Sequence, residues 1–313
     1  MKIAFHTNHL GIAGTEVAVF DYAFFNQQLL NNESIIVSRL NPAQDDPEVI
    51  EKFKNHFKVI QYNDFSEVEK ILDENKVDVF YALKSGENDG IVSKGRKSVI
   101  HCVFGETYEP HGNVYAYISE WLSKRMNFGI HPWVPHMINL PEEDGDYREF
   151  LKIPKDAIVF GRYGSYKTFD ITFVHEAIKD VIEKRKNAYF LFANTQPFFI
   201  HPRIIYLKSL IDLRQKVRFI NTCDAMLHAR KRGETFGLAC GEFSIKNKPI
   251  ITYGFSPERN HLDILKDKAI IYYNNVDLIK ILNTFEPSQK NWDAYSKEYT
   301  PEKVMQKFKT VFL

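Results

Sequence analysis

The chain has 313 residues, of which 44% are hydrophobic and 26% are charged, and its formal net charge at pH 7 is +1. This length exceeds what one hydrophobic core usually supports, so we expect two domains in an ordinary globular protein. The near-zero charge argues against a nucleic-acid-binding surface. Three unpatterned cysteines, Cys102, Cys223 and Cys240, fit reduced thiols in a cytoplasmic protein and offer no zinc site.

Neither a signal peptide nor a membrane span is expected. The chain begins Met1-Lys2-Ile3-Ala4-Phe5, which is typical of a strand. No apolar run approaches the roughly 18 residues that a membrane helix needs. The sequence therefore predicts a cytoplasmic protein without a transmembrane segment, leaves a peripheral membrane contact open, and gives no oligomeric state.

Short apolar runs alternate with amphipathic segments in the first part of the chain. Strands are predicted at residues 3–6, 34–38, 57–61, 77–83, 98–103 and 114–118. Helices are predicted at residues 15–30, 47–56 and 66–74, the last with Ser66 as its N-cap. This alternation is typical of a parallel sheet with helices on both faces.

An acidic segment without apolar periodicity, residues 139–146, is predicted to be a linker. A second series of strands follows at 157–160, 188–192, 217–220, 225–227, 249–252 and 269–273. Helices are predicted at 171–184, 203–213, 236–245, 257–265 and 277–285, with helical stretches at 292–298 and 301–312.

We therefore predict an α/β protein with two doubly wound, Rossmann-like domains that face each other across a cleft. The domains are residues 1–140 and 141–299, and a C-terminal helix at about 300–313 packs back on the first domain. In such folds the ligand binds at the carboxyl edges of the sheets.

Two glutamates, Glu234 and Glu242, stand eight positions apart in the most informative segment. The strand at 225–227 would bring Glu234 to the carboxyl edge of a sheet, and a helix that starts near Phe236 would point free amides at an anion. Eight helical residues rise about 12 Å. The two carboxylates therefore cannot share one metal, but they could hold two ends of a long polar ligand such as a nucleotide sugar.

Arg162 and Lys167 lie on a glycine-bearing loop after the strand at 157–160. The family resemblance set out below implies that two cations at this place could stabilise the charge that develops on a departing diphosphate, mainly in the transition state. The alternative interpretation is that both are solvated surface charges.

These motifs, in this order and at this spacing, resemble those of the retaining GT-B-fold glycosyltransferases of family 4. The resemblance spans essentially the whole chain and is strongest from Ile153 to Thr252. Its motifs are the Glu–seven residues–Glu element with the Lys-Pro-Ile-Ile that follows, the basic loop at 160–167, and the segments 117–120 and 133–139. The loop at 11–16 stands in place of that family's Gly-Gly-x-Glu loop, with Ala13 instead of the first glycine.

The resemblance implies metal-independent transfer of a glycosyl unit, with retention, from a nucleotide diphosphate sugar to a hydroxyl of a glycan or glycoconjugate, without a cofactor. The first domain would hold the acceptor, and the second the donor. The implied catalytic residues are Arg162, Lys167, Glu234 and His101. The implied donor-binding residues are Gly14, Thr15, Gly161, Asn194, Thr235, Phe236, Gly237, Leu238 and Glu242, of which Glu242 would bind ribose hydroxyls.

Several of these roles have structural alternatives. His101 ends a strand and fits a hydrogen-bonded core histidine as well as a contact to the reacting sugar. His111 is a weaker candidate for the same contact, and His6 and His9 are more consistent with structural roles. The cations at 230–232 fit phosphate or acceptor recognition and a solvated loop equally well.

Asp144-Gly145-Asp146 has the form of the metal-binding triplet of another transferase fold. It lies in the polar linker, where turn chemistry accounts for it, so no metal site is predicted. Two other functions remain open: a non-catalytic nucleotide-sugar-binding protein and a sugar-nucleotide epimerase. The sequence gives neither the base and sugar of the donor nor the acceptor and the linkage.

Overall fold

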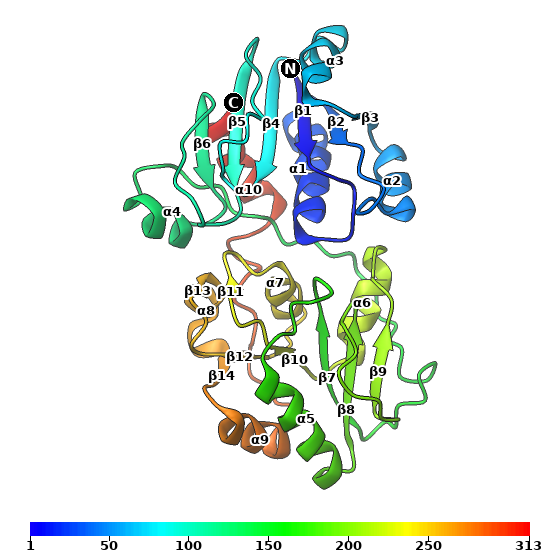
Figure 1. Cartoon of the computed structure of the whole chain (residues 1–313). Coiled ribbons are helices and arrows are strands. Elements are labelled where there is room, and N and C mark those ends of the chain that lie inside the picture. Colours follow the sequence, from blue (N-terminus) through cyan, green and yellow to red (C-terminus); the bar gives the residue numbers. More distant parts are fainter. The chain divides into compact units, whose positions relative to one another are not determined.

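The computed structural model describes residues 1–313, which divide into two compact units (Figure 1). Unit 1 comprises Met1–Met137 and Glu298–Leu313, and unit 2 comprises Ile138–Lys297. The chain therefore passes from unit 1 to unit 2 and returns, so the last helix belongs to the first unit.

Unit 1 is built on a six-stranded parallel sheet with the strand order β3-β2-β1-β4-β5-β6. Its strands are β1 Lys2–Thr7, β2 Glu33–Arg39, β3 Lys58–Tyr62, β4 Val79–Lys84, β5 Lys97–Cys102 and β6 Val114–Tyr117. Its helices are α1 Gly14–Leu30, α2 Pro47–Lys54, η1 Phe65–Glu67, α3 Val68–Glu74, α4 Glu120–Asn127 and α10 Pro301–Phe312. The strands and helices predicted for this part of the sequence are confirmed, apart from small shifts of their ends.

The predicted N-cap at Ser66 is wrong. Asp64 caps this segment, because its side chain accepts a hydrogen bond from the Ser66 amide at 2.9 Å. The Glu67 side chain in turn accepts from the Asp64 amide at 2.8 Å, which completes a capping box. The segment therefore begins as the short helix η1 and continues as α3.

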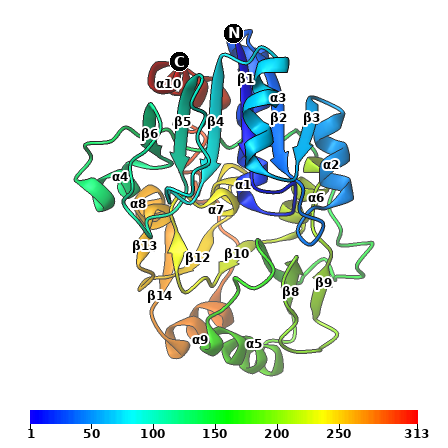
Figure 2. The same cartoon turned by 45° about the horizontal axis from the view of Figure 1, so that its top comes forward.

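The C-terminal helix α10 completes the core of unit 1 (Figure 2). The ring of Phe308 lies 5.5 Å from that of Tyr22 in α1 and 5.4 Å from that of Tyr81 in β4. The ring of Phe312 lies 5.6 Å from that of Tyr81. All four side chains are fully buried, so α10 covers apolar surface that the rest of unit 1 would otherwise expose.

Unit 2 contains a second six-stranded parallel sheet, ordered β14-β12-β10-β7-β8-β9. Its strands are β7 Ile158–Tyr163, β8 Ala188–Ala193, β9 Ile204–Leu207, β10 Ala225–His228, β12 Ile250–Tyr253 and β14 Ala269–Tyr272. The strands β11 Gly233–Glu234 and β13 Glu258–Arg259 form a separate two-stranded pair. The helices are α5 Thr172–Lys184, α6 Leu213–Thr222, α7 Leu238–Ile245, α8 Asn260–Leu265, η2 Lys266–Lys268 and α9 Asn275–Thr284.

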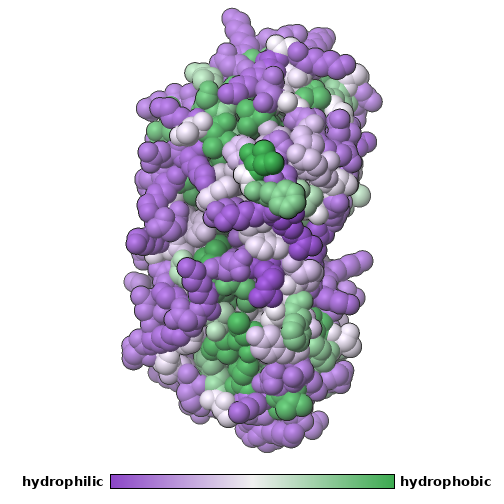
Figure 3. Space-filling view, turned by 90° about the vertical axis from the view of Figure 1, so that its left-hand side faces the viewer, coloured by the Kyte–Doolittle hydropathy of each residue, from purple (hydrophilic) through white to green (hydrophobic).

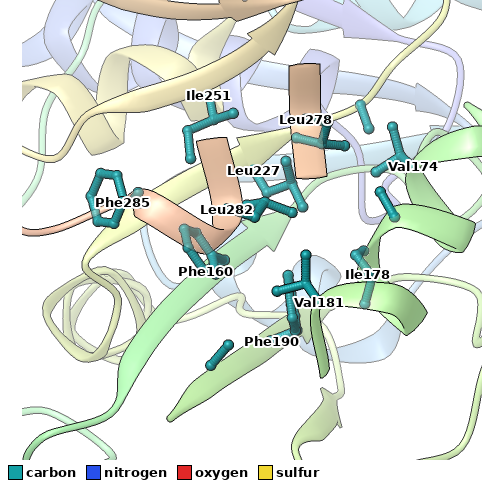
Figure 4. Close-up of a cluster of buried hydrophobic side chains, with 14 of the residues drawn as sticks. Phe160, Val174, Ile178, Val181, Phe190, Leu227, Ile251, Leu278, Leu282 and Phe285 are labelled. Carbon is teal, nitrogen blue, oxygen red and sulfur yellow. The ribbon is translucent and has the colours of Figure 1, made fainter. Parts of the chain in front are cut away.

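The core of unit 2 lies between α5, α9 and one face of the sheet (Figure 4). The buried apolar residues of α5 recur at helical spacing, so one face of the helix packs against the strands. The buried residues that meet there include Phe160, Val174, Ile178, Phe190, Leu227, Ile251, Leu278 and Leu282.

Three predicted elements of unit 2 are wrong. The segment predicted as a helix at 203–213 contains the strand β9, which pairs with β8. The segment predicted as a strand at 217–220 lies inside α6, whose start is capped by Asp212. The stretch at 292–298 contains no helix, because the Asp293 carboxylate accepts from the Tyr295 and Ser296 amides and forms a local turn instead.

The predicted linker at 139–146 is attached to unit 2. The Asn221 side chain in α6 donates to the Glu143 and Gly145 carbonyls at 2.8 and 3.0 Å. Arg218 forms an ion pair with Glu143 at 3.1 Å. Glu143 therefore pairs with a basic residue of α6, and the segment is held against unit 2 instead of standing in solvent as a free connection.

Candidate functional site

Both sheets have the strand order of a doubly wound fold, so each has a point where the chain reverses its direction of travel across the sheet. Ligands of such folds bind outside the carboxyl ends of the strands at this point. In unit 2 the reversal falls between β7 and β10, and in unit 1 between β1 and β4. The residues at the ends of these four strands are therefore the first to consider.

Arg162 at the end of β7 holds the loop that follows this strand. Its two terminal nitrogens donate to Ser165 O at 2.9 Å, Thr168 Oγ1 at 2.7 Å, Asn194 O at 3.2 Å and Thr195 Oγ1 at 2.5 Å. These bonds occupy the four terminal hydrogens of the guanidinium. The expected direct contact between Arg162 and a diphosphate is not what the structure shows, because the side chain shapes the loop.

The same loop presents Lys167 to solvent, where its ammonium group has no ion-pair or hydrogen-bond partner in the chain. Asn194 at the end of β8, with φ of 46°, donates from its side chain to the Gly164 carbonyl at 2.8 Å. A Cβ at position 164 would lie 2.8 Å from a terminal nitrogen of Arg162. The loop thus packs closely around the guanidinium of Arg162 and leaves the ammonium group of Lys167 in solvent.

Gly161 was expected to bind the donor, but it has a packing role. It lies inside β7, and a Cβ at this position would lie 2.2 Å from the sulfur of Cys223. The glycine therefore allows β7 to lie close to the end of α6.

Glu234 is brought to the carboxyl edge of the sheet by the short strand β11. Gly233 precedes it with φ of +80°, and a Cβ on Gly233 would lie 2.0 Å from the Glu258 carbonyl oxygen. Only glycine fits there, because neither the backbone conformation nor the space admits a side chain. Pairing of β11 with β13 then fixes the direction of the Glu234 side chain.

The Glu234 carboxylate is 21% exposed and has a partner for each oxygen. His228 Nε2 lies 3.2 Å from Oε1, and Arg230 donates to Oε2 at 2.8 Å. Burial by itself raises the pKa of Glu234, but the hydrogen bond from His228 and the charge of Arg230 outweigh it and lower the pKa to about 2. Glu234 is therefore an ionised acceptor that is partly open to solvent.

A chain of buried hydrogen bonds continues behind Glu234. His228 Nδ1 lies 2.9 Å from Thr252 Oγ1, which lies 3.1 Å from His261 Nε2. Burial lowers the pKa of His261 to about 3, so this ring is neutral at physiological pH. Donation from His228 Nε2 to Glu234, from the Thr252 hydroxyl to His228 Nδ1 and from His261 Nε2 to Thr252 satisfies all three contacts. The chain thus fixes the orientation of the His228 ring.

Charges from both sides of the β7–β10 reversal meet in this cluster. The charges of Glu234, Arg230 and Asp170 all act on Arg162, whose pKa burial lowers to about 10. The Asp170 carboxylate accepts from the Lys231 amide at 2.7 Å, which joins the loop after β7 to the loop after β10. The structure therefore brings together Arg162 and Glu234, which the sequence singled out separately.

The helix that follows Glu234 begins two residues later than predicted. Gly237, with φ of 92°, precedes α7, and no side chain caps the helix. Thr235 and Phe236 are buried, and the Phe236 carbonyl accepts from Asn260 and Tyr295 at 3.4 and 3.3 Å. Leu238, the first residue of α7, is half-buried. The uncapped first turn of α7 is the part of this segment that suits an anionic ligand.

Glu242, expected to bind ribose, forms a buried ion pair inside unit 2. Its side chain is 6% exposed, and Lys216 donates to Oε1 at 2.7 Å. The Tyr163 hydroxyl donates to Oε2 at 2.5 Å. Both oxygens are thus held by the protein, and the structure gives Glu242 the role of fastening α7 to α6 and β7.

In unit 1, the loop after β1 leads into α1, and its polar side chains bond to one another. Gly14 begins α1, and Thr15 donates from its hydroxyl to Glu16 at 2.8 Å instead of presenting it to solvent. The Glu16 carboxylate is buried, accepts from Thr7 at 3.2 Å and lies 3.6 Å from His9 Nε2. Burial raises the pKa of Glu16.

His101 has a structural role. It is fully buried, its Nδ1 lies 2.7 Å from the Tyr81 hydroxyl, and its Nε2 lies 2.9 Å from the Val134 carbonyl. The Phe312 ring of α10 lies 5.0 Å away. With both ring nitrogens bonded and no path to solvent, His101 belongs to the core, which was the alternative that the sequence left open.

The sequence pointed to His6 and His111 but not to Lys84 and Asp89, which complete a polar cluster at the β1–β4 reversal of unit 1. Lys84 at the end of β4 is buried, pairs with Asp89 and lies 3.4 Å from His111 Nε2. His6 at the end of β1 bonds the Tyr62 hydroxyl at 2.8 Å, and burial together with the charge of Lys84 lowers the pKa of His6 to about 3. A lysine inside an apolar strand carries no local signal that it will be paired.

The chain contains no group of three or more His, Cys, Asp or Glu side chains placed to hold a metal ion. Asp146 accepts from the Arg148 amide at 2.7 Å, which is the turn chemistry expected for that segment. None of the helices combines the length and the apolar character needed to cross a bilayer.

No protein-family model matches the chain, and no match was found among curated proteins. Solved structures are similar over the whole length. HepE of Anabaena, in complex with UDP-glucose, is 13% identical with a TM-score of 0.77, and the match covers 99% of both chains. The lipopolysaccharide outer core galactosyltransferase WaaB is 13% identical with a TM-score of 0.62, again over 99% of both chains.

A putative UDP-N-acetylglucosamine 2-epimerase from Listeria monocytogenes is 11% identical with a TM-score of 0.61, covering 97% of this chain and 94% of that one. Such low identities establish a shared fold and nothing finer. The chain has the GT-B architecture: an α/β protein with two parallel six-stranded sheets.

Proposed function

We propose that this protein transfers a glycosyl unit from a uridine diphosphate sugar to a hydroxyl of a glycan or glycoconjugate acceptor, with retention of configuration and without a metal. One observation carries the proposal. Glu234 is an ionised, partly exposed carboxylate at the β7–β10 reversal, next to the uncapped start of α7 and in one charged cluster with the loop that presents Lys167.

The similar structures support the choice of donor. HepE has been solved with UDP-glucose, with UDP and glucose, and with UDP, and MnaA of S. aureus has been solved with UDP. The family resemblance of the Glu234 segment points to the same class of donor. Uridine is accordingly the first base to test.

The roles within the cluster divide as follows. Glu234 accepts hydrogen bonds from hydroxyls of the donor sugar, because it is charged and partly open. Lys167 and the first amides of α7 stabilise the charge that grows on the leaving diphosphate. Arg162 positions Lys167 through the loop and does not contact the donor, while His228 and Arg230 hold Glu234.

We assign the Glu234 carboxylate to the hydroxyls of the donor sugar and not to covalent attack, so we favour departure and attack on the same face of the sugar. The bond from the anomeric carbon to the diphosphate oxygen breaks, and a bond to the acceptor oxygen forms. The diphosphate takes the acceptor's proton. Unit 1 supplies the acceptor side of the reaction, where Glu16 and His9 are the polar residues of the loop after β1.

The test is a thermal-shift screen of the full chain against UDP, UDP-glucose, UDP-N-acetylglucosamine and GDP-mannose. A true donor at 100 times its dissociation constant adds about 2.7 kcal/mol of stability. Glu234→Gln should leave the affinity for UDP unchanged and abolish the extra affinity for the sugar nucleotide. Loss of UDP binding in this variant would make Glu234 part of the nucleotide site instead.

Epimerisation is the second candidate, favoured by the similarity to the Listeria structure. It predicts a change in the sugar of UDP-N-acetylglucosamine without any acceptor, which chromatography of the products detects. Binding of a nucleotide sugar without turnover across an acceptor panel would instead indicate a binding protein. Activity that persists in EDTA supports the metal-independent mechanism, and activity that only manganese restores contradicts it.

A further inference from the structure

The turn that ends α4 exposes two large apolar side chains. Phe128 follows the last residue of the helix and is 93% exposed, and Ile130 is 80% exposed. Between them, Gly129 has φ of +81°. We refer to residues 128–130 as the α4 tip; both of its side chains are surrounded by solvent.

Phe128 stands where its type of residue is unfavourable. Its φ of 59° lies in the left-handed region, which glycine and asparagine adopt readily at helix ends and which a bulky residue adopts at a cost. The exposed ring gains no packing that would offset this cost. A residue with an unfavourable backbone conformation and no compensating side-chain packing is expected at functional positions.

Basic residues flank the α4 tip. The Lys124 side chain is 65% exposed, and its stem passes the tip, because a Cβ on Gly129 would lie 3.6 Å from its Cγ. Arg125 extends over the ring of Trp121 with its guanidinium carbon 5.2 Å from the ring centre. The one acidic residue of α4, Glu120, pairs with Lys124 at 2.7 Å, so the helix retains a net positive charge.

A further aromatic side chain lies beside the tip. Tyr108 is 50% exposed, and its hydroxyl lies 3.1 Å from Nε2 of His131, the residue that follows the tip. Figure 3 looks onto the side of the molecule that carries α4 in Figure 1, and in its upper half apolar side chains protrude among polar ones. The surface thus combines apolar side chains, the amphipathic ring of Tyr108 between the exposed Glu106 and Glu109, and the cations of α4.

We propose that the α4 tip inserts into the interfacial region of a phospholipid bilayer with anionic headgroups. Phe128 and Ile130 enter the acyl boundary, Tyr108 lies at the headgroup level, and Lys124 and Arg125 face the anionic phosphates. A protein partner would need a broad apolar face, whereas the tip offers two large exposed apolar side chains, Phe128 and Ile130. Two side chains and two cations give weak, reversible binding.

The experiment is flotation of the full chain with phosphatidylcholine vesicles that contain about 30% phosphatidylserine, compared with vesicles of phosphatidylcholine alone. We expect binding to the anionic vesicles that falls as salt is raised. The double variant Phe128→Asn/Ile130→Asn should bind at least ~10-fold more weakly. Asparagine suits the left-handed position, so this variant keeps or gains thermal stability and its loss of binding is not a loss of folding.

Ile200→Asn is the matched control, since Ile200 is 92% exposed in unit 2, and it should leave vesicle binding unchanged. The proposal is overturned if the wild-type chain does not float with anionic vesicles, or if the double variant floats as well as the wild type. It is also overturned if light scattering shows a wild-type dimer that the double variant lacks, because the tip would then contact a second copy of the chain. None of these outcomes depends on the proposed transferase activity.

Discussion

The two units have the same strand order, yet the carboxyl edges of their sheets are chemically different. At the β7–β10 reversal of unit 2, Glu234 and Lys167 are open to solvent, and the side chains around them hold them in place. At the β1–β4 reversal of unit 1, His6 and Lys84 are buried and paired within the unit. With the same topology, the charged side chains at the reversal are exposed to solvent in unit 2 and buried in unit 1.

Buried polar groups at the edge of a doubly wound sheet can orient exposed side chains, or they can join strands to each other. In unit 2 the buried polar groups, such as Arg162 and His261, lie behind the exposed ones and orient them. In unit 1 the histidines join one strand to another, as His6 of β1 does with Tyr62 of β3 and His101 of β5 with Tyr81 of β4. Each of the following predictions tests whether the two edges differ as described.

The largest expected difference is the response to acid. Burial lowers the pKa of His6, His101 and His136 in unit 1, and of His261 in unit 2, to about 3. The unfolded chain therefore binds more protons between this value and about 6.5, and stability is lost as the pH falls through this window. Each histidine costs about 2 kcal/mol at about pH 5.

Unit 1 should therefore lose about 6 kcal/mol and unit 2 about 2 kcal/mol from these groups between about pH 7 and pH 5. Hydrogen exchange followed by mass spectrometry, with peptides from β1–β5 and from β7–β12, measures the two losses separately. An equal loss of protection in both units would contradict the contrast between their buried histidines.

The ion pair beneath α7 gives the next largest effect. Glu242→Gln leaves the ammonium group of Lys216, whose side chain is 8% exposed, without a charged partner. Breaking a buried pair in this way typically costs 3–5 kcal/mol, roughly, in the free energy of unfolding. Urea denaturation measures the loss. Glu176→Gln, which breaks an exposed pair with Lys179, is the control and should cost less than about 1 kcal/mol.

This prediction also decides between the two interpretations of Glu242. If the variant keeps its stability but binds UDP about tenfold more weakly, its carboxylate binds ribose, as the family resemblance implies. The ion pair would then be a resting arrangement that the ligand replaces.

Lys167→Ala tests the solvent-exposed carboxyl edge of the sheet in unit 2 directly. Because Lys167 has no partner in the chain, its loss should leave the stability within about 0.5 kcal/mol. Removing a stabiliser of charge in the transition state lowers turnover by about 10²–10³. Steady-state kinetics with the donor identified by the screen measures the effect. Lys186→Ala changes an exposed lysine elsewhere in unit 2 and should leave turnover as it was.

Thr252→Val gives the smallest of the expected effects. It removes the hydroxyl that joins His228 to His261 while it keeps the volume of the side chain. Leaving buried ring nitrogens without a partner costs about 1–3 kcal/mol. Thermal unfolding measures this cost, with Thr310→Val on an exposed face of α10 as a control. A loss no greater than that of the control would show that the chain of hydrogen bonds behind Glu234 contributes nothing.

The sequence predicted the architecture because the buried parallel strands are continuous apolar runs. It failed at residues 203–222, where the signals are short. β9 is an edge strand in which only Ile204 is buried, so it lacks the apolar run of its neighbours. In α6 the neighbouring apolar residues Phe219 and Ile220 suggested a strand, although Asp212 and Val217 mark the start and the buried face of a helix.

The site residues could be predicted only where the signal lies within a short stretch of sequence. Glu234 and Lys167 could be found because each follows a strand in a recognisable motif. The partners of Glu242 could not, because Lys216 and Tyr163 lie 26 and 79 positions away. The difference between a free carboxylate and a paired one arises from packing over such distances, which the local pattern does not contain.

The return of α10 to unit 1 has a consequence for the order of events during synthesis. Unit 1 begins to leave the ribosome first, but the helix that carries Phe308 and Phe312 leaves it only after the whole of unit 2. The 160 residues from 138 to 297 separate the two parts of unit 1. At the usual 5–20 residues per second, the apolar surface around Tyr22 and Tyr81 waits for about 10–30 s before its cover is made. Chaperone binding should therefore be strongest on the nascent first unit and fall once α10 has emerged and packed on it.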